Sequence, residues 1–284
     1  MQKNERMEYG FGFIPSPQDD RDYEISRLVK SSPILPPSYI TNVPMNIFDQ
    51  GESSMCVGCS IANMKHIIEY RQNGDTDNFS PAYIYANRRP DDYKGEGLVP
   101  RQALKTLQDY GICHLFQFPG IYSYESAKKY YNLQKIKLDR IAYPFRISSY
   151  YRLSSINDIK TAIFTLGGAL VAYDVYDCLM EPDKNGVVKY DPEHLGECYG
   201  GHQMLAVGWN ETGFIVVNSW SEDYGRACKE LGVRGGICTI PYNYMPTEAW
   251  AVTDEITEKS VAAKYREKKG FFRGICDYIK NLFA

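Results

Sequence analysis

Residues 49–60, DQGESSMCVGCS, lead into a predicted helix and contain two cysteines, Cys56 and Cys59. Beyond Cys56 the apolar residues recur at the spacing of one helical face, and Asn73-Gly74 ends the pattern. A helix N-terminus stabilises negative charge and lowers the pKa of a thiol placed there. Cys56, at the predicted helix start, is therefore a candidate nucleophile. Cys59, one turn deeper, is expected to pack in the core.

The composition is that of an ordinary globular protein. The 284 residues are 44% hydrophobic and 24% charged, which is enough for one large domain or two lobes. The net charge of -3 and the lack of a phosphate loop or basic-aromatic patch argue against nucleic acid as a partner. Residues 1–30 show no signal-peptide pattern, and no apolar run has the length of a membrane span. We therefore expect a cytoplasmic product as encoded.

The eight cysteines are scattered through the chain, unlike the dense framework of a small secreted domain. Thiols are therefore the expected state for most of them. A disulfide between Cys198 and either Cys228 or Cys238 is still an alternative.

The chain changes character along its length. Residues 1–34 are polar and broken by prolines, so they predict an extended leader. The next part is helical as far as Pro144, and apolar β-type runs follow from Gly168. This order predicts an α+β protein with two segregated lobes. The predicted helices are Cys56–Tyr70, Pro81–Arg89, Pro100 to a stop at Gly111, and Ile156–Leu166.

A cysteine nucleophile needs a neighbouring imidazole, and four histidines could supply one. His66 lies in the Cys56 helix about 15 Å along its axis at 1.5 Å per residue, which is out of reach. His114 and His194 lie in loop-like stretches. His202 follows two glycines at the start of a predicted strand, so we expect it to project from a rigid edge.

A predicted hairpin brings a second polar side chain to His202. The β-type runs 203–209 and 214–217 flank a four-residue turn, which returns Asn218 toward His202. The Asn218 amide oxygen can then fix the imidazole tautomer, and Trp220 can cover the pair from water.

Gln50 lies six residues before Cys56 on the loop that leads into the helix. Its amide could join the Cys56 backbone N–H in an oxyanion hole, where preformed donors stabilise developing negative charge.

This set of residues closely resembles the papain-like cysteine peptidases. The shared features are Gln50-Gly51, Cys56 at a helix start, His202 and the run Asn218-Ser219-Trp220, within residues 45–245. The Asp-Gln-Gly spacing and the leader are similar to those of bacterial and phage members. The resemblance implies a papain-like fold with a helical lobe, a β-barrel-like lobe and an active-site cleft between them.

The resemblance also implies a chemistry without metal or cofactor. Cys56 would attack a peptide carbonyl to give a thioester acyl-enzyme, Gln50 would stabilise the oxyanion, and His202, oriented by Asn218, would protonate the leaving amine. A polypeptide substrate would lie extended along the cleft. The residues expected to bind it are Gly97, Gly201, Trp220, Ala169 and Val171.

The expected organisation has three parts. They are a leader at 1–34, a peptidase domain at 35–255 with lobes at about 48–144 and 145–255, and a helix at 256–284. We hypothesise that the leader lies in or near the cleft and is removed on activation. The C-terminal helix is basic and amphipathic, which fits an anionic membrane surface, the groove of a protein partner, or packing on its own domain.

Other interpretations of the same residues stay open. A catalytically silent relative would use the cleft only to bind peptide, and a transpeptidase or amidase would use the same site on another amide. A zinc site at Cys56 and Cys59 would need further ligands, for which Cys113 and His114 are the candidates. A redox pair would need a βαβ setting before the helix.

Overall fold

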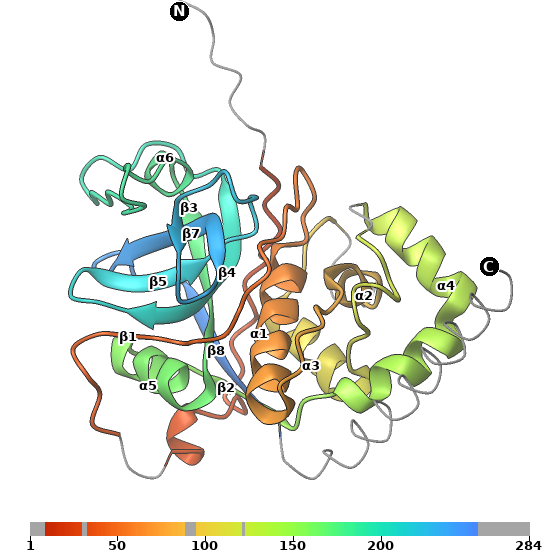
Figure 1. The fold of residues 1–284 in the computed structure, drawn as a ribbon. Helices are drawn as coiled ribbons and strands as arrows, with labels where there is room; N and C mark the ends of the chain where they lie inside the picture. The colour runs from red at the N-terminus through yellow and green to blue at the C-terminus, as the bar shows by residue number, and fades with distance from the viewer. Residues whose placement is uncertain (1–8, 30–32, 89–94, 121–122, 255–284) are drawn as a thin grey trace, which may run out of the picture.

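A helical lobe packs against one face of an antiparallel sheet (Figure 1). The computed structural model describes residues 9–29, 33–88, 95–120 and 123–254. The α+β expectation is confirmed. The helices are α1 (Cys56–Asn73), α2 (Pro81–Ala86), α3 (Pro100–Tyr110), α4 (Tyr124–Ala142), α5 (Ile156–Leu166) and α6 (Asp177–Met180), with 3-10 turns at Ile25–Arg27 and Tyr143–Phe145.

The central helix α1 begins at Cys56, as the sequence predicts. Fourteen successive residues from Cys56 are buried, because α1 lies between the sheet and the other helices of its lobe. Gly74 ends the helix in the left-handed conformation at φ 66°, and its N–H bonds back to Tyr70. At the other end the N-cap residue is Met55, whose side chain forms no hydrogen bond with the helix. The first backbone N–H groups of α1 are therefore not occupied by a capping side chain of Met55.

The sheet runs in the order β2-β8-β3-β4-β5-β7-β6, and β1 pairs with β4 off this path. The predicted hairpin is β4 with β5, which pair Trp209 with Phe214 and Leu205 with Val217. The strands are β1 (Tyr39–Ile40), β2 (Ser149–Arg152), β3 (Ala169–Val175), β4 (Gly200–Trp209), β5 (Gly213–Val217), β6 (Arg226–Cys228), β7 (Val233–Pro241) and β8 (Glu248–Thr253).

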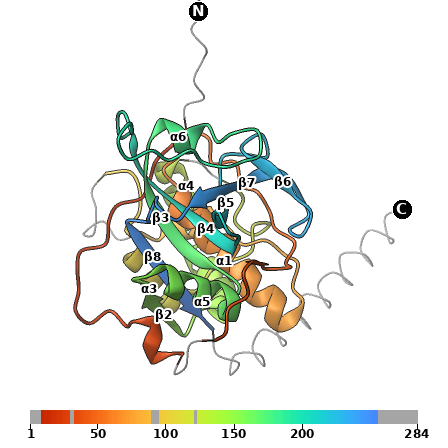
Figure 2. The ribbon, with the colours of Figure 1, turned by 90° about the vertical axis from the view of Figure 1, so that its left-hand side faces the viewer.

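Two apolar cores lie on the two faces of the sheet. One fills the space between the helical lobe and the strands and contains Leu170, Ala172 and Leu205 together with Cys56. The other lies under α5 and contains alternate strand residues. Figure 2 shows α5 beside β8, β3 and β2. The first core therefore joins the lobes, and the second belongs to the β lobe.

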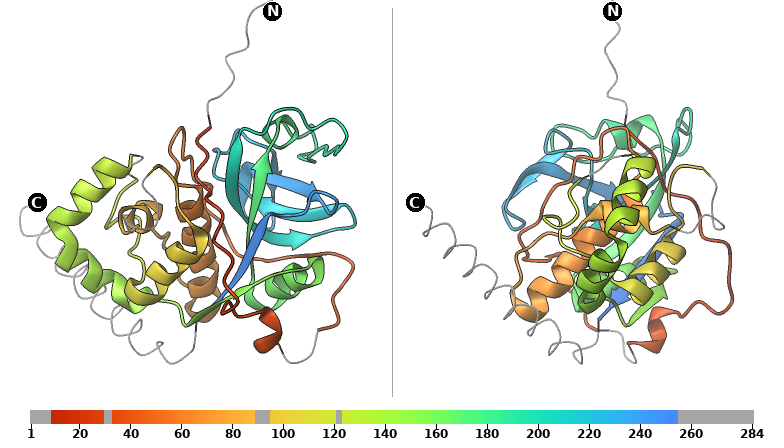
Figure 3. Two further views of the ribbon diagram at one scale, coloured as in Figure 1. Left: turned by 180° about the vertical axis from the view of Figure 1, so that it is seen from behind. Right: turned by 90° about the vertical axis from the view of Figure 1, so that its right-hand side faces the viewer.

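The leader runs between the two lobes, beside α1 (Figure 3). It is described from Tyr9, and its backbone bonds to both lobes at Leu98 and Gly201. The predicted C-terminal helix at 256–284 lies outside the described residues. Within those that are described, no helix is both long and apolar enough to cross a membrane.

Candidate active site

Gln50 links the two lobes at the N-terminus of α1. Its backbone N–H donates to the Ser219 carbonyl at 2.9 Å, and its side-chain oxygen accepts from the Ser219 hydroxyl at 2.5 Å. The neighbouring Asp49 forms an antiparallel bridge with Trp220. These contacts orient the Gln50 amide group, which is almost fully buried, so that its nitrogen is a fixed donor.

The tautomer of His202 is fixed by Asn218. The Oδ1 atom of Asn218 lies 2.7 Å from His202 Nε2, and the same oxygen accepts from the Ser219 backbone N–H at 2.7 Å. Because a backbone N–H can only donate, the shared atom is an acceptor, and Nε2 must carry the proton. His202 Nδ1 is then the unprotonated nitrogen, and no hydrogen-bond partner for it exists among the described residues.

Aromatic rings cover the His202–Asn218 pair. Trp220 stacks on His202 with ring centroids 4.3 Å apart, and Tyr9 of the leader stacks on Trp220 at 4.4 Å. Phe11 meets the edge of Trp220 at 6.1 Å. The leader thus extends the cover that Trp220 was expected to provide.

Burial keeps the Cys56 thiol and the His202 imidazole neutral in this state. It raises the pKa of the Cys56 thiol to about 11, although hydrogen bonds from the backbone of Gln203 and Gly12 favour the thiolate. It also lowers the pKa of His202 to about 4, opposed by the bond to Asn218. Both shifts have one cause, the exclusion of water, and both disfavour a thiolate–imidazolium pair.

The leader occupies the cleft through its backbone. Gly12 accepts from the Leu98 N–H at 2.8 Å, Phe13 donates to the Gly201 carbonyl at 3.1 Å, and Gly10 accepts from the Gln50 side-chain amide at 2.8 Å. There is no room for side chains at the two glycines. An added Cβ would lie 2.1 Å from the Ser53 carbonyl oxygen at Gly10 and 2.0 Å from that of Ser54 at Gly12.

The leader presents its amide to the thiol. The Phe13–Leu98 bridge is parallel, and the backbone of Gly12 donates toward Cys56 sulfur. A nucleophile attacks a carbonyl carbon, whereas this arrangement directs an N–H at Cys56. The leader therefore runs parallel to the chain at Leu98 and directs a backbone donor at the thiol.

The substrate-binding predictions divide into two groups. Gly97, Gly201 and Trp220 all contact the leader: Cβ atoms built at the two glycines would lie 2.7 Å from the Gly12 oxygen and 2.5 Å from the Phe13 ring. Ala169 and Val171 do not reach the cleft. Their side chains belong to the core under α5.

On β3, the side chains that face the Cys56 side of the sheet are those one residue away from the predicted Ala169 and Val171. Leu170 and Ala172 belong to the core that contains Cys56, whereas Ala169 and Val171 point through the sheet. Successive side chains of a strand alternate between faces, so the cleft side of β3 carries Ala172.

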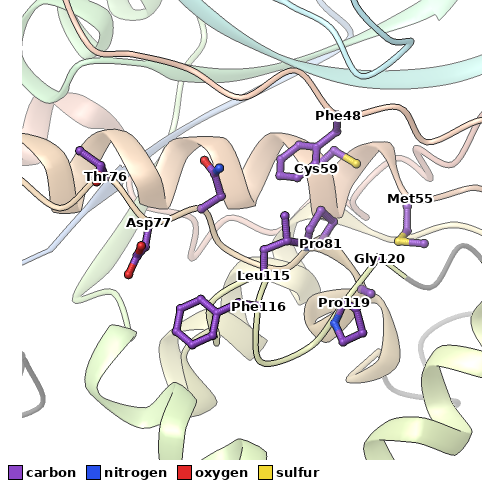
Figure 4. A pocket seen from close by; sticks show the side chains of 12 residues that line it. Phe48, Met55, Cys59, Thr76, Asp77, Pro81, Leu115, Phe116, Pro119 and Gly120 are labelled. Carbon is purple, nitrogen blue, oxygen red and sulfur yellow. The ribbon is translucent and has the colours of Figure 1, made fainter. Parts of the chain in front are cut away.

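Cys59 is buried one turn into α1. It lines a pocket of about 440 Å³ with Phe48, Met55 and Pro81, on the helical side of α1 (Figure 4). Burial raises its pKa above the ordinary range, and it lies within hydrogen-bond reach of the Ser219 side chain. The packing role expected for Cys59 fits this position.

The zinc interpretation of the two cysteines gains no support. In the described part of the chain, the residues whose ligand atoms lie within 4.8 Å of one another are Asp75, Asp77 and His114. Neither Cys56 nor Cys59 belongs to that group. All seven cysteines of this part are unbridged, so the bridges considered for Cys198, Cys228 and Cys238 are not formed.

Three contributors to the site were not assigned roles from the sequence. Ser219 fixes both Gln50 and Asn218, and Gln203 donates to Ser60 of α1 at 2.7 Å. Glu248 binds the leader at the far end of the cleft. The position of Ser219 between Asn218 and Trp220 was a usable signal, whereas the other two depend on contacts across the fold.

The sequence of the chain matches the family model "Papain family cysteine protease" over residues 42–244. The chain belongs to the papain family. It is a cysteine protease, a hydrolase. The resemblance to papain-like cysteine peptidases that the sequence shows is confirmed. No curated protein matches the chain.

Solved structures of papain-family proteins share this fold. Xylellain, a cysteine protease from Xylella fastidiosa, is 19% identical with a TM-score of 0.71 and covers 90% of this chain and 100% of its own. Digestive procathepsin L 3 of Tenebrio molitor is 20% identical with a TM-score of 0.64, and the match covers 87% of this chain and 77% of its own. The Carica candamarcensis cysteine protease CMS1MS2, solved in complex with E-64, is 14% identical with a TM-score of 0.59, and the match covers 78% of this chain and 100% of its own.

Proposed function

We propose that this papain-family chain hydrolyses peptide bonds with Cys56 as nucleophile, His202 as acid and base, and Asn218 as the residue that positions His202. The observation that carries the proposal is the fixed tautomer of His202. Its Nε2–H is held by Asn218, while Nδ1 is unprotonated and without a partner among the described residues. The adjacent Gln203 backbone bonds to Cys56 sulfur, so thiol and imidazole share one site.

The chemistry proceeds in two acyl transfers. His202 Nδ1 takes the thiol proton, and the Cys56 sulfur forms a bond to the substrate carbonyl carbon. Gln50 and the first N–H groups of α1 stabilise the oxyanion, and His202 returns its proton to the leaving amine. Water, deprotonated by His202, then attacks the thioester and releases the acid and the free thiol.

The same proposal includes a latent state. Residues 9–13 take the Gln50 donor and the cleft backbone that a substrate would need. Their presence also desolvates Cys56 and His202, which holds both neutral. Displacement of the leader, with or without its cleavage, would therefore precede turnover.

The test compares the full chain with Cys56→Ala on an unstructured protein substrate. We expect cleavage by the first and none by the second. Iodoacetamide at low stoichiometry, mapped by mass spectrometry, reports which thiol reacts; Cys198 is exposed, so adducts are assigned residue by residue. Equal cleavage by Cys56→Ala, or labelling of Cys59 in preference to Cys56, would overturn the assignment.

A further inference from the structure

The solvent-facing side of α4 carries two aliphatic side chains. Leu133 is 76% exposed and Ile136 is 87% exposed, although leucine and isoleucine are usually buried. They lie three residues apart, so they are neighbours on the helix surface. Tyr143, at the end of α4, is 52% exposed and continues the same line. Apolar side chains therefore extend over about 15 Å of this face, at 1.5 Å per residue.

Basic side chains flank the two aliphatic residues. Lys129, Lys137 and Arg140 are exposed and lie one helical turn from Leu133 or Ile136. Among the described residues these three cations have no ion-pair partner, whereas Lys135 of the same helix pairs with Asp139. Helix α4 contains five basic and two acidic residues, although the whole chain has a net charge of -3. The outer face of α4 is therefore both apolar and locally positive.

The opposite face of α4 fixes the helix on its lobe. Ala127, Tyr131 and Leu138 are buried, and the Tyr131 ring meets that of Tyr83 in α2 edge-on at 5.8 Å. The Tyr131 hydroxyl also donates to Asp139 at 2.8 Å. Helix α4 lies at the outer edge of the helical lobe, away from the sheet (Figures 1 and 3). A surface bound to its outer face would therefore leave the cleft between the lobes accessible.

We propose that the outer face of α4 binds an anionic lipid surface. The inference does not depend on the proposed peptidase function. In an interfacial helix, apolar side chains enter the boundary between headgroups and acyl chains, while lysine and arginine bind the anionic headgroups. Leu133 and Ile136 supply the apolar part here, and Lys129, Lys137 and Arg140 supply the charges. The long stems of these cations let their charged ends stay at the level of the headgroups.

Protein occupants fit this face less well. The centres of protein interfaces are enriched in aromatic residues and depleted of lysine, whereas the centre of this face is aliphatic and has lysines beside it. A second copy of the chain would place the same positive face against itself in a two-fold dimer. The segment 256–284 is also basic in sequence. Both of these occupants would bring like charges together, which is costly.

The experiment sediments the full chain with vesicles of phosphatidylcholine, alone or with an equal part of phosphatidylserine. We expect binding to the mixed vesicles only, and weaker binding as salt screens the charges. The double variant Leu133→Ser with Ile136→Ser should weaken binding by about tenfold or more, because two apolar side chains no longer insert. Lys137→Ala or Arg140→Ala should each weaken it by about fivefold.

The control variants change equally exposed residues elsewhere. Ile34→Ser alters an isoleucine that is 97% exposed before β1, and Lys184→Ala alters an exposed lysine after α6. Neither should change binding, and circular dichroism checks that every variant is folded.

Three results would overturn the proposal. The first is the absence of binding to mixed vesicles. The second is undiminished binding by the double variant, which would assign the lipid contact to another segment such as 256–284. The third is a dimer in solution that the double variant dissociates, which would assign the face to a second copy. The peptidase proposal stands or falls separately, by the cleavage test with Cys56→Ala.

Discussion

The two halves of the leader are held by different interactions. Residues 10–13 bind through backbone hydrogen bonds in a space where neither Gly10 nor Gly12 could carry a side chain. From Ser16 onward side-chain contacts are added to the backbone bonds, with the Ser16 hydroxyl on Glu248 and Asp22 on Arg101. In the latent state proposed above, the first half blocks the site and the second half holds the first in place. A bulky substitution in the first half should therefore release the leader most strongly, and loss of a polar contact in the second half should release it more weakly.

The largest effect is expected from Gly12→Val. Any Cβ there would lie 2.0 Å from the Ser54 carbonyl oxygen, and backbone cannot move aside as a flexible side chain can. The leader should leave the cleft, and kcat/KM on a peptide substrate should rise by about tenfold or more, as expected when a minor open state becomes dominant. Trypsin cleavage at Arg21 should accelerate in parallel. Gln18→Val, at an exposed leader position, is the matched control; equal effects of both variants would contradict the steric account.

Ser16→Ala should have a smaller effect in the same direction. It removes the hydroxyl's bond to Glu248 and the longer bond that the hydroxyl accepts from the Arg101 backbone N–H at 3.2 Å, and leaves the Ser16 backbone N–H bond to Glu248 in place. A net hydrogen bond contributes about 1 kcal/mol, which corresponds to about a fivefold rise in the open population and in kcat/KM. A rise as large as that of Gly12→Val would show that anchoring, and not blocking, controls latency.

Acid should open the leader. In the covered state burial holds the pKa of His202 at about 4, below its ordinary 6.5. Between these values the open state binds more protons than the closed state, so lowering the pH from 7 to 4.5 favours opening. Hydrogen exchange of residues 9–16 should become faster at pH 4.5, after correction for the intrinsic exchange rate.

The contribution of His202 to the acid response needs its own control. His202→Gln should lose part of the acid response. An acid response of undiminished size in that variant would show that protonation of His202 does not open the leader.

Asp22→Asn should change kcat/KM by only about twofold, because ion pairs near the surface contribute about 1 kcal/mol or less. The Asp22 and Arg101 side chains are 13% and 16% exposed. A tenfold activation would show that this pair, and not Ser16, is the main anchor.

Cys59→Ser is expected to have the smallest effect, since Cys59 lines the pocket beside Phe48, Met55 and Pro81 and does not belong to the contacts described for either half of the leader. Activity should stay close to that of the wild type, because burying a hydroxyl in place of a thiol has a modest cost when a polar neighbour such as Ser219 is near. A tenfold loss in a folded variant, judged by circular dichroism, would give Cys59 a role in the site.

The parts of the site that sequence reasoning found are those with short-range signals. Cys56 was found from helix periodicity and Asn218 from a hairpin with a four-residue turn, and both elements form as expected. The face of β3 was not found, because Ala169–Tyr173 is a continuous apolar run without the alternation that distinguishes two faces. Glu248 was missed because its partner Ser16 is 232 residues away.

Gln50 donates its side-chain N–H to the Gly10 carbonyl, so in the proposed mechanism the leader and the oxyanion compete for one donor. A tethered competitor acts at an effective concentration in the millimolar range for short flexible linkers, whatever the amount of enzyme. A ligand that binds only beside Cys56 and Gln50 must reach a concentration above the leader's effective concentration to displace it. A long polypeptide can first bind elsewhere along the cleft and then displace the leader step by step, so the tether would act as a filter for substrate length.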